Sequence, residues 1–316
     1  MAEFFLVPPP GGDPFESQAY EELVFRRARG RSLLMLWENP LAVVIGKHQN
    51  LFGEVNAWEA WRRGLPVVRR ESGGGAVTHA PGNLNYTMVT DEADGWSADA
   101  FAGLVAQAVR GLGADAQVFG SAAIAVSGRK VSGSAQRIAQ GRVLHHGTLL
   151  FDAVLRSVDR ALARSPHVVS SRGTRSKPAA IGNIRPFLRR DMGLPEFKAA
   201  LADALCGGST METGITAEEA RELARDKYRS PEWMYGRNPA FEWRKEFFWR
   251  SAAHALEYAS EGGRISRISL TPAKTPAASA LETLVGAYLH PPAVAAALSE
   301  TLGARDAESL APHFFG

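Results

Sequence analysis

Short apolar runs that end at glycine or polar residues constrain the fold of this chain more than any other feature. Five of them, LLMLW, AVVIG, PVVRR, AVTH and LNYTMV, occupy residues 33–37, 42–46, 66–70, 76–79 and 84–89. Runs of this length with β-branched side chains are typical of strands. Strands are expected again at 122–126, 130–138 and 143–152.

Two segments between these strands have helical periodicity instead. Apolar residues recur every three or four positions in 54–64 and in 97–113, and the second segment begins at Ser97, a residue type favoured as an N-cap. Strands and helices mixed in this order predict an α+β fold.

A second, smaller domain is expected after a boundary near Trp243, which gives domains of residues 1–243 and 244–316. The segment from 165 to 186 is rich in Ser, Arg, Gly and Pro and is expected to be a loop, either an ordered functional loop or a disordered one. Helices are predicted at 195–206, 216–226, 277–288 and 291–303, and a hairpin is predicted from 254–259 and 264–270 around Gly262 and Gly263.

Composition excludes several classes of protein. The 316 residues include no apolar stretch near the roughly 20 residues that span a bilayer, and the first residues lack a secretory leader, so we expect a cytoplasmic protein that does not enter a membrane. Cys206 is the only cysteine, which rules out an internal disulfide, and it is expected to be a packed thiol. A net charge of +3 does not favour a nucleic-acid partner.

The stretch RRESGGGAVTH at 69–79 is the first candidate for chemistry. Three consecutive glycines remove every Cβ, so backbone N–H groups can turn toward an anion that approaches the main chain closely. A plain hairpin turn is the alternative interpretation. Arg70 favours an anion site, because a guanidinium pairs well with phosphate or carboxylate. The P-loop pattern is absent.

Lys130, in GRKVSGSA, is the second candidate. Small residues beside a lysine leave room for a ligand, and the ammonium group can hold a carboxylate and a phosphate together, although most surface lysines are simply solvated. His145 and His146 point to opposite faces if they lie on a strand, so only one of them is expected to face a site. The metalloprotease, nucleophile-elbow and dinucleotide motifs are absent, which leaves activation of a carboxylate by ATP as the chemistry that fits.

Four motifs in order resemble the lipoate-protein ligase A family of the biotin/lipoyl protein ligase superfamily. They lie at 39–56, 69–87, 128–137 and 144–152, and the segments 171–184 and 228–241 are also similar to the family. The resemblance implies a mixed-sheet α+β catalytic domain, residues 1–243, and a small α+β C-terminal accessory domain. It implies a two-step reaction in which lipoate and ATP, with Mg²⁺, give lipoyl-adenylate, and the lipoyl group then passes to a carrier lysine.

The resemblance also implies roles for particular residues. Lys130 would bind the lipoyl carbonyl oxygen and the α-phosphate, Arg70 would hold the adenylate region, and Trp37 would lie at the end of the lipoyl tail, unless it is a core tryptophan. No metal ligand is assigned. The partners would be lipoyl carrier domains of the 2-oxoacid dehydrogenase E2 type or the glycine cleavage H protein type. The remaining residues of the implied ATP and lipoyl-adenylate pocket are Ser72, Gly73, Gly74, Gly75, Ala76, Val77, Thr78, His79, Asn83, Ser132, Gly133, His146, Gly147 and Thr148.

The chain departs from the family pattern at two places. Ala122-Ala123 stands where members usually carry Asn-Asp, and His79-Ala80 stands where His-Asp is common. These departures keep two alternatives open: a lipoyl or octanoyl transferase that uses a preformed activated donor, and a non-catalytic homologue that binds lipoyl-adenylate or a carrier. The segment 170–185 is the candidate lid over the pocket.

Overall fold

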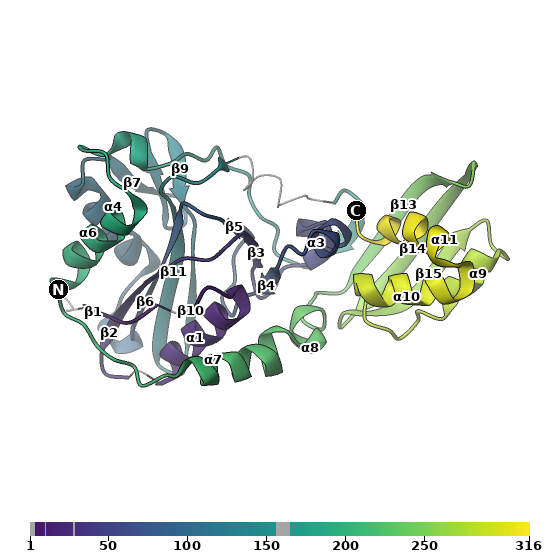
Figure 1. Cartoon of the computed structure of the whole chain (residues 1–316), viewed down its shortest axis with the longest axis horizontal. Helices are drawn as coiled ribbons and strands as arrows, with labels where there is room; N and C mark the ends of the chain where they lie inside the picture. Colours follow the sequence, from purple (N-terminus) through teal and green to yellow (C-terminus); the bar gives the residue numbers. More distant parts are fainter. Residues whose placement is uncertain (1–3, 10, 28, 156–164) are drawn as a thin grey trace.

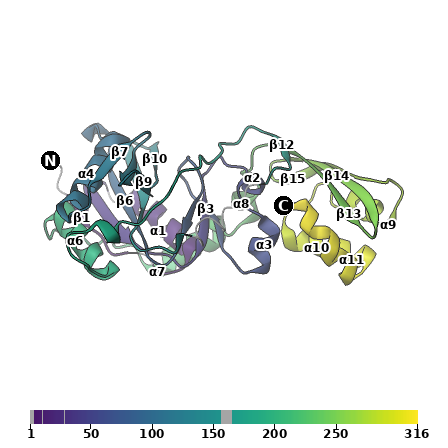
Figure 2. The ribbon, with the colours of Figure 1, turned by 90° about the horizontal axis from the view of Figure 1, so that it is seen from above.

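The computed structural model describes residues 4–9, 11–27, 29–155 and 165–316. It consists of a larger sheet-rich part and a smaller C-terminal part that lie end to end (Figure 1). The C-terminus turns back to the middle of the molecule, near α3, in both views (Figures 1 and 2).

A five-stranded sheet forms the centre of the larger part, in the order β1-β2-β6-β11-β10. Apart from the parallel pair β1 and β2, its neighbouring strands are antiparallel. Almost every residue of the central strands is buried, because helices cover both faces. The bounds are β1 (Phe4–Leu6), β2 (Ser32–Trp37), β6 (Asn83–Asp91), β10 (Ser134–Ala139) and β11 (Arg142–Leu150).

The two faces of this sheet pack against different helices. On one face, Leu34 and Leu36 belong to a core that includes α4 (Ala98–Gly111) and α6 (Leu194–Cys206). On the other face, Met35 and Trp37 pack with α1 (Pro14–Arg27). This alternation along β2 follows from the two-residue period of a strand.

Two small sheets stand beside the main one. Strands β4 (Val67–Arg69), β3 (Ala42–Ile45) and β5 (Val77–His79) form the first, with α2 (Leu51–Glu54) and α3 (Ala57–Arg62) between β3 and β4. The glycine run connects β4 to β5. The second is the antiparallel meander β7 (Ala116–Phe119), β8 (Ala123–Val126) and β9 (Arg129–Ser132), which follows η1 (Glu92–Asp94) and α4.

The C-terminal part is a four-stranded antiparallel sheet with helices on one face. Buried and exposed residues alternate along β13, as expected for a sheet with one covered face. The bounds are β12 (Val168–Ser171), β13 (Phe241–Trp249), β14 (Ala252–Glu261), β15 (Arg264–Thr271), α9 (Pro276–Glu282), α10 (Pro291–Leu302), α11 (Ala304–Leu310) and η4 (Ala311–Phe314).

The connection between the two parts runs along the lower edge of Figure 1 as α7 (Ala217–Leu223), η3 (Ala224–Tyr228) and α8 (Pro231–Met234), after η2 (Arg185–Phe187). Strand β12 comes from the first part of the chain but pairs with β13, Val168 opposite Trp243. The predicted boundary at residue 243 therefore falls inside a strand of the C-terminal sheet, and the division into 1–243 and 244–316 remains a prediction.

The α+β class is confirmed, and the predicted strands of the first half are present with shifts of one or two residues at their ends. The predicted strand at 130–138 is interrupted at Gly133, which separates β9 from β10, and the predicted helix at 277–288 ends at Glu282. Helix α1 was not predicted. Its buried residues include Ser17, Gln18, Glu21 and Glu22, which obscure any apolar stripe.

Two expectations from composition can be compared with the described residues. Within those ranges, no helix is both long enough and apolar enough to cross a membrane. Cys206 is a buried free thiol at the end of α6, and burial raises its pKa to about 11, as expected of a packed core cysteine.

Candidate active site

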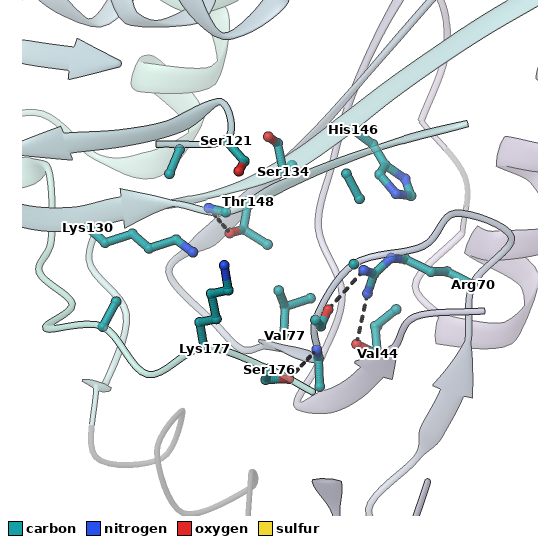
Figure 3. Close-up of a pocket in the computed structure, with 18 of the residues that line it drawn as sticks. Val44, Arg70, Val77, Ser121, Lys130, Ser134, His146, Thr148, Ser176 and Lys177 are labelled. Atoms are coloured by element: carbon teal, nitrogen blue, oxygen red, sulfur yellow. Dashed lines mark hydrogen bonds between the residues drawn. The ribbon is translucent and has the colours of Figure 1, made fainter. Parts of the chain in front are cut away.

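A cavity of about 520 Å³ lies between the glycine run, the strands β8, β9 and β11, and the segment 174–179 (Figure 3). We call it the main chamber. A second cavity of about 300 Å³, the side chamber, adjoins it. Both are lined by residues that include Ala76, Val77, Lys130, Gly133, Thr148, Ser176 and Lys177. A chamber of this size accommodates a small molecule.

The glycine run is shaped by close backbone contacts. Gly74 has φ of +84°, a left-handed conformation that other residues rarely adopt. A Cβ on Gly46 would lie 2.3 Å from the carbonyl oxygen of Gly74, so glycine is required on the neighbouring strand end as well. A Cβ on Gly75 would meet Ser176 at 3.1 Å. The run is therefore a tight wall of the chamber.

The guanidinium of Arg70 bonds to the backbone of the glycine run. Its side chain is buried and donates to the carbonyl oxygens of Val44 at 3.2 Å, of Gly75 at 2.8 Å and of Gly73. Burial lowers its pKa to about 10, although the charge of Glu21 opposes this effect. Arg70 thus lines the chamber and its guanidinium fixes the backbone of the run, while its role in holding the adenylate region stays a prediction.

A chain of buried hydrogen bonds links Arg70 to helix α1, which packs on the chamber-facing side of the main sheet. Arg70 Nε donates to Ser72 Oγ at 2.8 Å, Ser72 Oγ lies 2.6 Å from His146 Nε2, and His146 Nδ1 lies 2.8 Å from Glu21 Oε1. Thr87 also donates to Glu21, at 2.6 Å. The predicted pocket residues Ser72 and His146 are therefore connected by hydrogen bonds to Glu21, a residue that the sequence patterns did not indicate.

Trp37 lies at the end of the main chamber near His146. It is buried, lines the main chamber, and donates from Nε1 to Thr87 Oγ1 at 3.0 Å. His79 lies edge-on to Trp37 with ring centroids 5.6 Å apart. Burial, with smaller contributions from His146 and Arg70, lowers the pKa of His79 to about 3, so its imidazole is neutral. This end of the chamber is uncharged and suits an apolar chain.

Lys130 lies at the other end, on β9. Its backbone is fixed by the second half of the candidate lid, residues 170–185, because its N–H donates to Ala180 at 2.8 Å and its carbonyl accepts from Gly182 at 3.0 Å. Gly133 leaves space for its side chain, since a Cβ there would lie 3.2 Å from Nζ. Burial lowers the pKa of Lys130. Within the described residues its ammonium group has no hydrogen bond or ion pair.

The candidate lid lies over the chamber and is attached to the glycine run. Ser176 Oγ accepts from the N–H of Ala76 at 2.7 Å and from Gln49 at 3.1 Å, and the N–H of Ser176 donates to Glu54 at 3.1 Å. Residues 174–179 line the main chamber, and the ammonium group of Lys177 faces the same space as that of Lys130 (Figure 3). No sequence motif around Lys177 or Glu54 indicated that these residues belong to the site.

Most of the predicted residues meet at these chambers. Of the two adjacent histidines, His146 faces the main chamber, whereas His145 stacks on Phe101 in the core at 5.1 Å. Asn83 lines neither chamber and donates instead to Asn85, which lines the main one. Gly73 lines a neighbouring cavity. The predicted residues that line the main chamber are Trp37, Arg70, Gly74, Gly75, Ala76, Val77, His79, Lys130, Gly133, His146, Gly147 and Thr148, and the side chamber adds Thr78 and Ser132.

A divalent metal finds few ligands in this site. No group of three or more His, Cys, Asp or Glu residues with metal-site geometry occurs among the residues that the structure describes. Ala123 lines the main chamber, at a position where the resemblance to the family predicts Asp. Glu54 is the one carboxylate in the described walls of the two chambers, and it already accepts from Ser176. Magnesium prefers an octahedral set of oxygen ligands, and these residues do not provide one.

Comparison with known families agrees with this geometry. Residues 13–206, which carry four of the five strands of the main sheet, the glycine run and both chambers, match the model of the lipoyl protein ligase A/B catalytic domain. The chain belongs to this family. The match ends with α6, before the connection to the C-terminal part.

Two bacterial relatives extend the match beyond the catalytic domain. A lipoate-protein ligase of Staphylococcus aureus is 32% identical over 82% of this chain and 81% of its own length. A lipoate-protein ligase of Bacillus subtilis is 35% identical over 72% of this chain and 72% of its own length.

Solved structures share the fold. A P. falciparum protein in complex with lipoate aligns over 94% of each chain with a TM-score of 0.63 and 17% identity, so the C-terminal part is included in the similarity. A lipoate-protein ligase A bound with ATP aligns over 73% of this chain and 97% of its own, with a TM-score of 0.58 and 24% identity.

Proposed function

We propose that this chain is an ATP-dependent lipoate-protein ligase that activates lipoate to lipoyl-adenylate and transfers the lipoyl group to a carrier lysine. Both bacterial relatives are lipoate-protein ligases, and one solved relative binds lipoate and another ATP. The observation that carries the proposal is the polarity of the main chamber, in which an uncharged end at Trp37 and His79 faces a cationic end at Lys130.

The first step brings two anions together, because the lipoate carboxylate attacks the α-phosphate of ATP and pyrophosphate leaves. The unpaired ammonium of Lys130 offsets this repulsion and holds the carboxylate and the phosphate next to each other. Its partial burial strengthens the interaction, since fewer water molecules compete. The lipoyl tail extends toward Trp37, where the buried wall replaces water with apolar contacts.

The second step transfers the acyl group. The neutral amine of the carrier lysine attacks the carbonyl carbon of the mixed anhydride, a carbon–nitrogen bond forms, AMP leaves with the electrons of the carbon–oxygen bond, and the nitrogen loses a proton to water. The anhydride is reactive toward water, so the enzyme must shield it. The attached segment 174–179 provides this shield. The carriers that we propose are lipoyl domains of the E2 type or the glycine cleavage H protein type.

A mass assay with purified protein, lipoate, ATP and an apo carrier domain tests this function. The carrier is expected to gain the mass of one lipoyl group, and the gain is expected to vanish without ATP. Transfer from added lipoyl-adenylate alone would identify a transferase that uses a preformed donor, and no transfer from either source would identify a binding homologue.

The variant Lys130→Ala tests the proposed catalytic role of this lysine separately from any effect on folding. Because its ammonium group has no partner in the described structure, the variant is expected to unfold at the same temperature as the wild type. We expect kcat/KM to fall by about a hundredfold or more, the usual effect of removing a group that stabilises developing charge. Lys274→Ala, at an exposed position of the C-terminal part, is the matched control. Near-normal turnover of Lys130→Ala would disprove the role assigned to this lysine.

A further inference from the structure

The charges that face the chambers are strongly unbalanced. Arg70, Lys130, Arg175 and Lys177 line the main chamber, and no Asp or Glu is among its described wall residues. The side chamber adds one carboxylate, Glu54. A bound nucleotide phosphate therefore meets an excess of protein cations before any metal ion is considered.

Arg175 and Lys177 are the cations in this set without an assigned role, and of the two only Lys177 lines both chambers. The side chain of Lys177 points from the lid into the space that Lys130 reaches from β9 (Figure 3). No salt bridge or hydrogen bond of its ammonium group occurs within the described residues. A lysine with no partner that faces a second unpaired lysine is arranged to share an anion.

The backbone beside Lys177 is already fixed. The preceding residue, Ser176, is held by Ala76 at 2.7 Å, by Gln49 at 3.1 Å and by Glu54 at 3.1 Å. Little backbone freedom remains to be lost when Lys177 binds a ligand, which favours binding. The same contacts leave Glu54 engaged, so that its carboxylate acts as a support for the lid.

We propose that Lys177 is a second phosphate-binding lysine, which shares the α-phosphate of the nucleotide with Lys130, and that no side chain lining the two chambers ligates a divalent metal. Ala123 is consistent with this arrangement, because an Asp at that position would add a carboxylate to the wall and offset one of the two ammonium charges. The inference rests on the proposed function, because it concerns the phosphate of the same reaction.

Titration calorimetry with AMP and with adenosine, in the presence of EDTA, tests the role of Lys177. We expect Lys177→Gln to weaken AMP binding by about tenfold and to leave adenosine binding unchanged, since a charge-assisted hydrogen bond to phosphate contributes about this much. Lys177→Arg is expected to retain most of the affinity for AMP. Arg172→Gln removes an exposed cation that precedes the segment 174–179 and lines neither chamber, and it should bind AMP like the wild type.

Unchanged AMP affinity in Lys177→Gln, or an equal loss for AMP and adenosine, would overturn the proposal. The binding assay does not depend on turnover. If the wild type lipoylates its carrier while Lys177→Gln binds AMP normally, the ligase function stands and the second lysine fails. If AMP binding shows the predicted pattern but no carrier is modified, the phosphate site stands and the ligase function fails.

The metal half of the proposal is tested with Mn²⁺ as a paramagnetic probe for Mg²⁺. Free Mn²⁺ has a sharp electron paramagnetic resonance signal that disappears when the ion is immobilised on a protein. We expect millimolar Mn²⁺ to keep its full signal in the presence of the nucleotide-free protein. Stoichiometric loss of the signal that is abolished in Glu54→Gln, which retains an acceptor for Ser176, would show that the chamber has a protein ligand for metal and would contradict the proposal.

Discussion

At the scale of single residues, the buried carboxylate of Glu21 has the most consequences for the site. It accepts hydrogen bonds at 2.8 Å from His146 and at 2.6 Å from Thr87, and through His146 and Ser72 it reaches Arg70. Both the uncharged end of the main chamber and the glycine run therefore depend on one side chain of α1.

Glu21→Leu and Glu21→Gln form a matched pair that tests this dependence. The leucine leaves a buried imidazole N–H and a buried hydroxyl without an acceptor, whereas the glutamine amide oxygen can still accept from both. We expect Glu21→Leu to lower the free energy of unfolding by about 2 to 5 kcal/mol, and Glu21→Gln to cost clearly less. Urea denaturation measures both values. Equal losses in the two variants would show that the hydrogen bonds do not matter.

Two buried histidines make stability depend on pH. Burial lowers the pKa of His79 and of His145 to about 3, from 6.5 in the unfolded chain. Between these values the unfolded chain binds more protons, so stability is complete above about pH 6.5 and is lost as the pH falls toward 3. Each histidine is expected to contribute a loss of about 2 kcal/mol between about pH 7 and pH 5.

The measurement is urea denaturation at both pH values. His145→Leu, which removes one titrating group from the core without touching the main chamber, is expected to reduce the loss by about 2 kcal/mol. An unchanged pH dependence in this variant would mean that His145 accepts a proton in the folded state.

The site residues that could be predicted from the sequence are those that form a recognisable pattern with their neighbours in the chain. Three glycines in a row and a lysine beside small residues stand out from their neighbours, and the structure places both at one chamber. Glu21, Glu54 and Lys177 do not stand out, because their importance arises from partners that are far away in the sequence. Glu21, for example, meets His146 across 125 residues.

At the scale of elements, the lid is the part of the site most open to experiment. The segment 174–179 contributes no helix or strand, and Ser176 attaches it to the glycine run at Ala76. Strand β12 precedes it and Ile181 bridges to Lys130 after it, so both ends of the segment are anchored. Attachment at Ser176 should decide how well the chamber excludes water.

Ser176→Ala is expected to loosen this cover. It removes the acceptor of the Ala76 N–H and of Gln49, so water should reach the mixed anhydride more easily. Without a carrier, we expect AMP release from lipoate and ATP to increase by about threefold to tenfold, the effect of about 1 kcal/mol for one hydrogen bond. Ser170→Ala, at an exposed position of β12, is the control. A rate of AMP release equal to that of the wild type would contradict the role of the attachment.

The elements that could be predicted from the sequence are those whose burial follows a simple period. Strands β2 and β3 are apolar on both faces, apolar residues alternate with Asn and Thr along most of β6, and α4 has a clear apolar stripe after its Ser97 cap. Helix α1 and strand β12 were not predicted. Helix α1 buries polar side chains against the site, and β12 is a strand because it pairs with β13, whose register the local sequence does not determine.

At the scale of the whole molecule, the residues directly before and after Arg70 in the sequence contact the segment that connects the two parts. Arg69, which is fully buried, donates to the carbonyl oxygen of Met234 at 2.8 Å and also bonds Asn238, in the connection to the C-terminal sheet. Glu71 pairs with Lys227 of the same connection. The end of β4, where the glycine run begins, is thus held by the segment that joins the two parts. Neither part is therefore expected to fold without the other.

Phe315 makes apolar contacts between the parts. It is fully buried and lies near Phe52 and Trp58 of the larger part, with ring centroids at 5.8 Å and 6.2 Å. We expect Phe315→Ala to lower the free energy of unfolding by about 3 to 5 kcal/mol, the usual loss for a buried phenylalanine. Phe248→Ala is the matched control, because that ring is 80% exposed on the uncovered face of the C-terminal sheet, and its loss should be within about 0.5 kcal/mol.

The shape of the unfolding curve in the same experiment shows whether the parts unfold together. Because one apolar core includes residues of α2, α3, β13, α10 and η4, we expect a single transition for the wild type and a single, shifted transition for Phe315→Ala. Two transitions in the variant, with the first lost on deletion of the C-terminal sheet, would mean that the parts fold separately. In that case the shared core would not couple the C-terminal part to the glycine run.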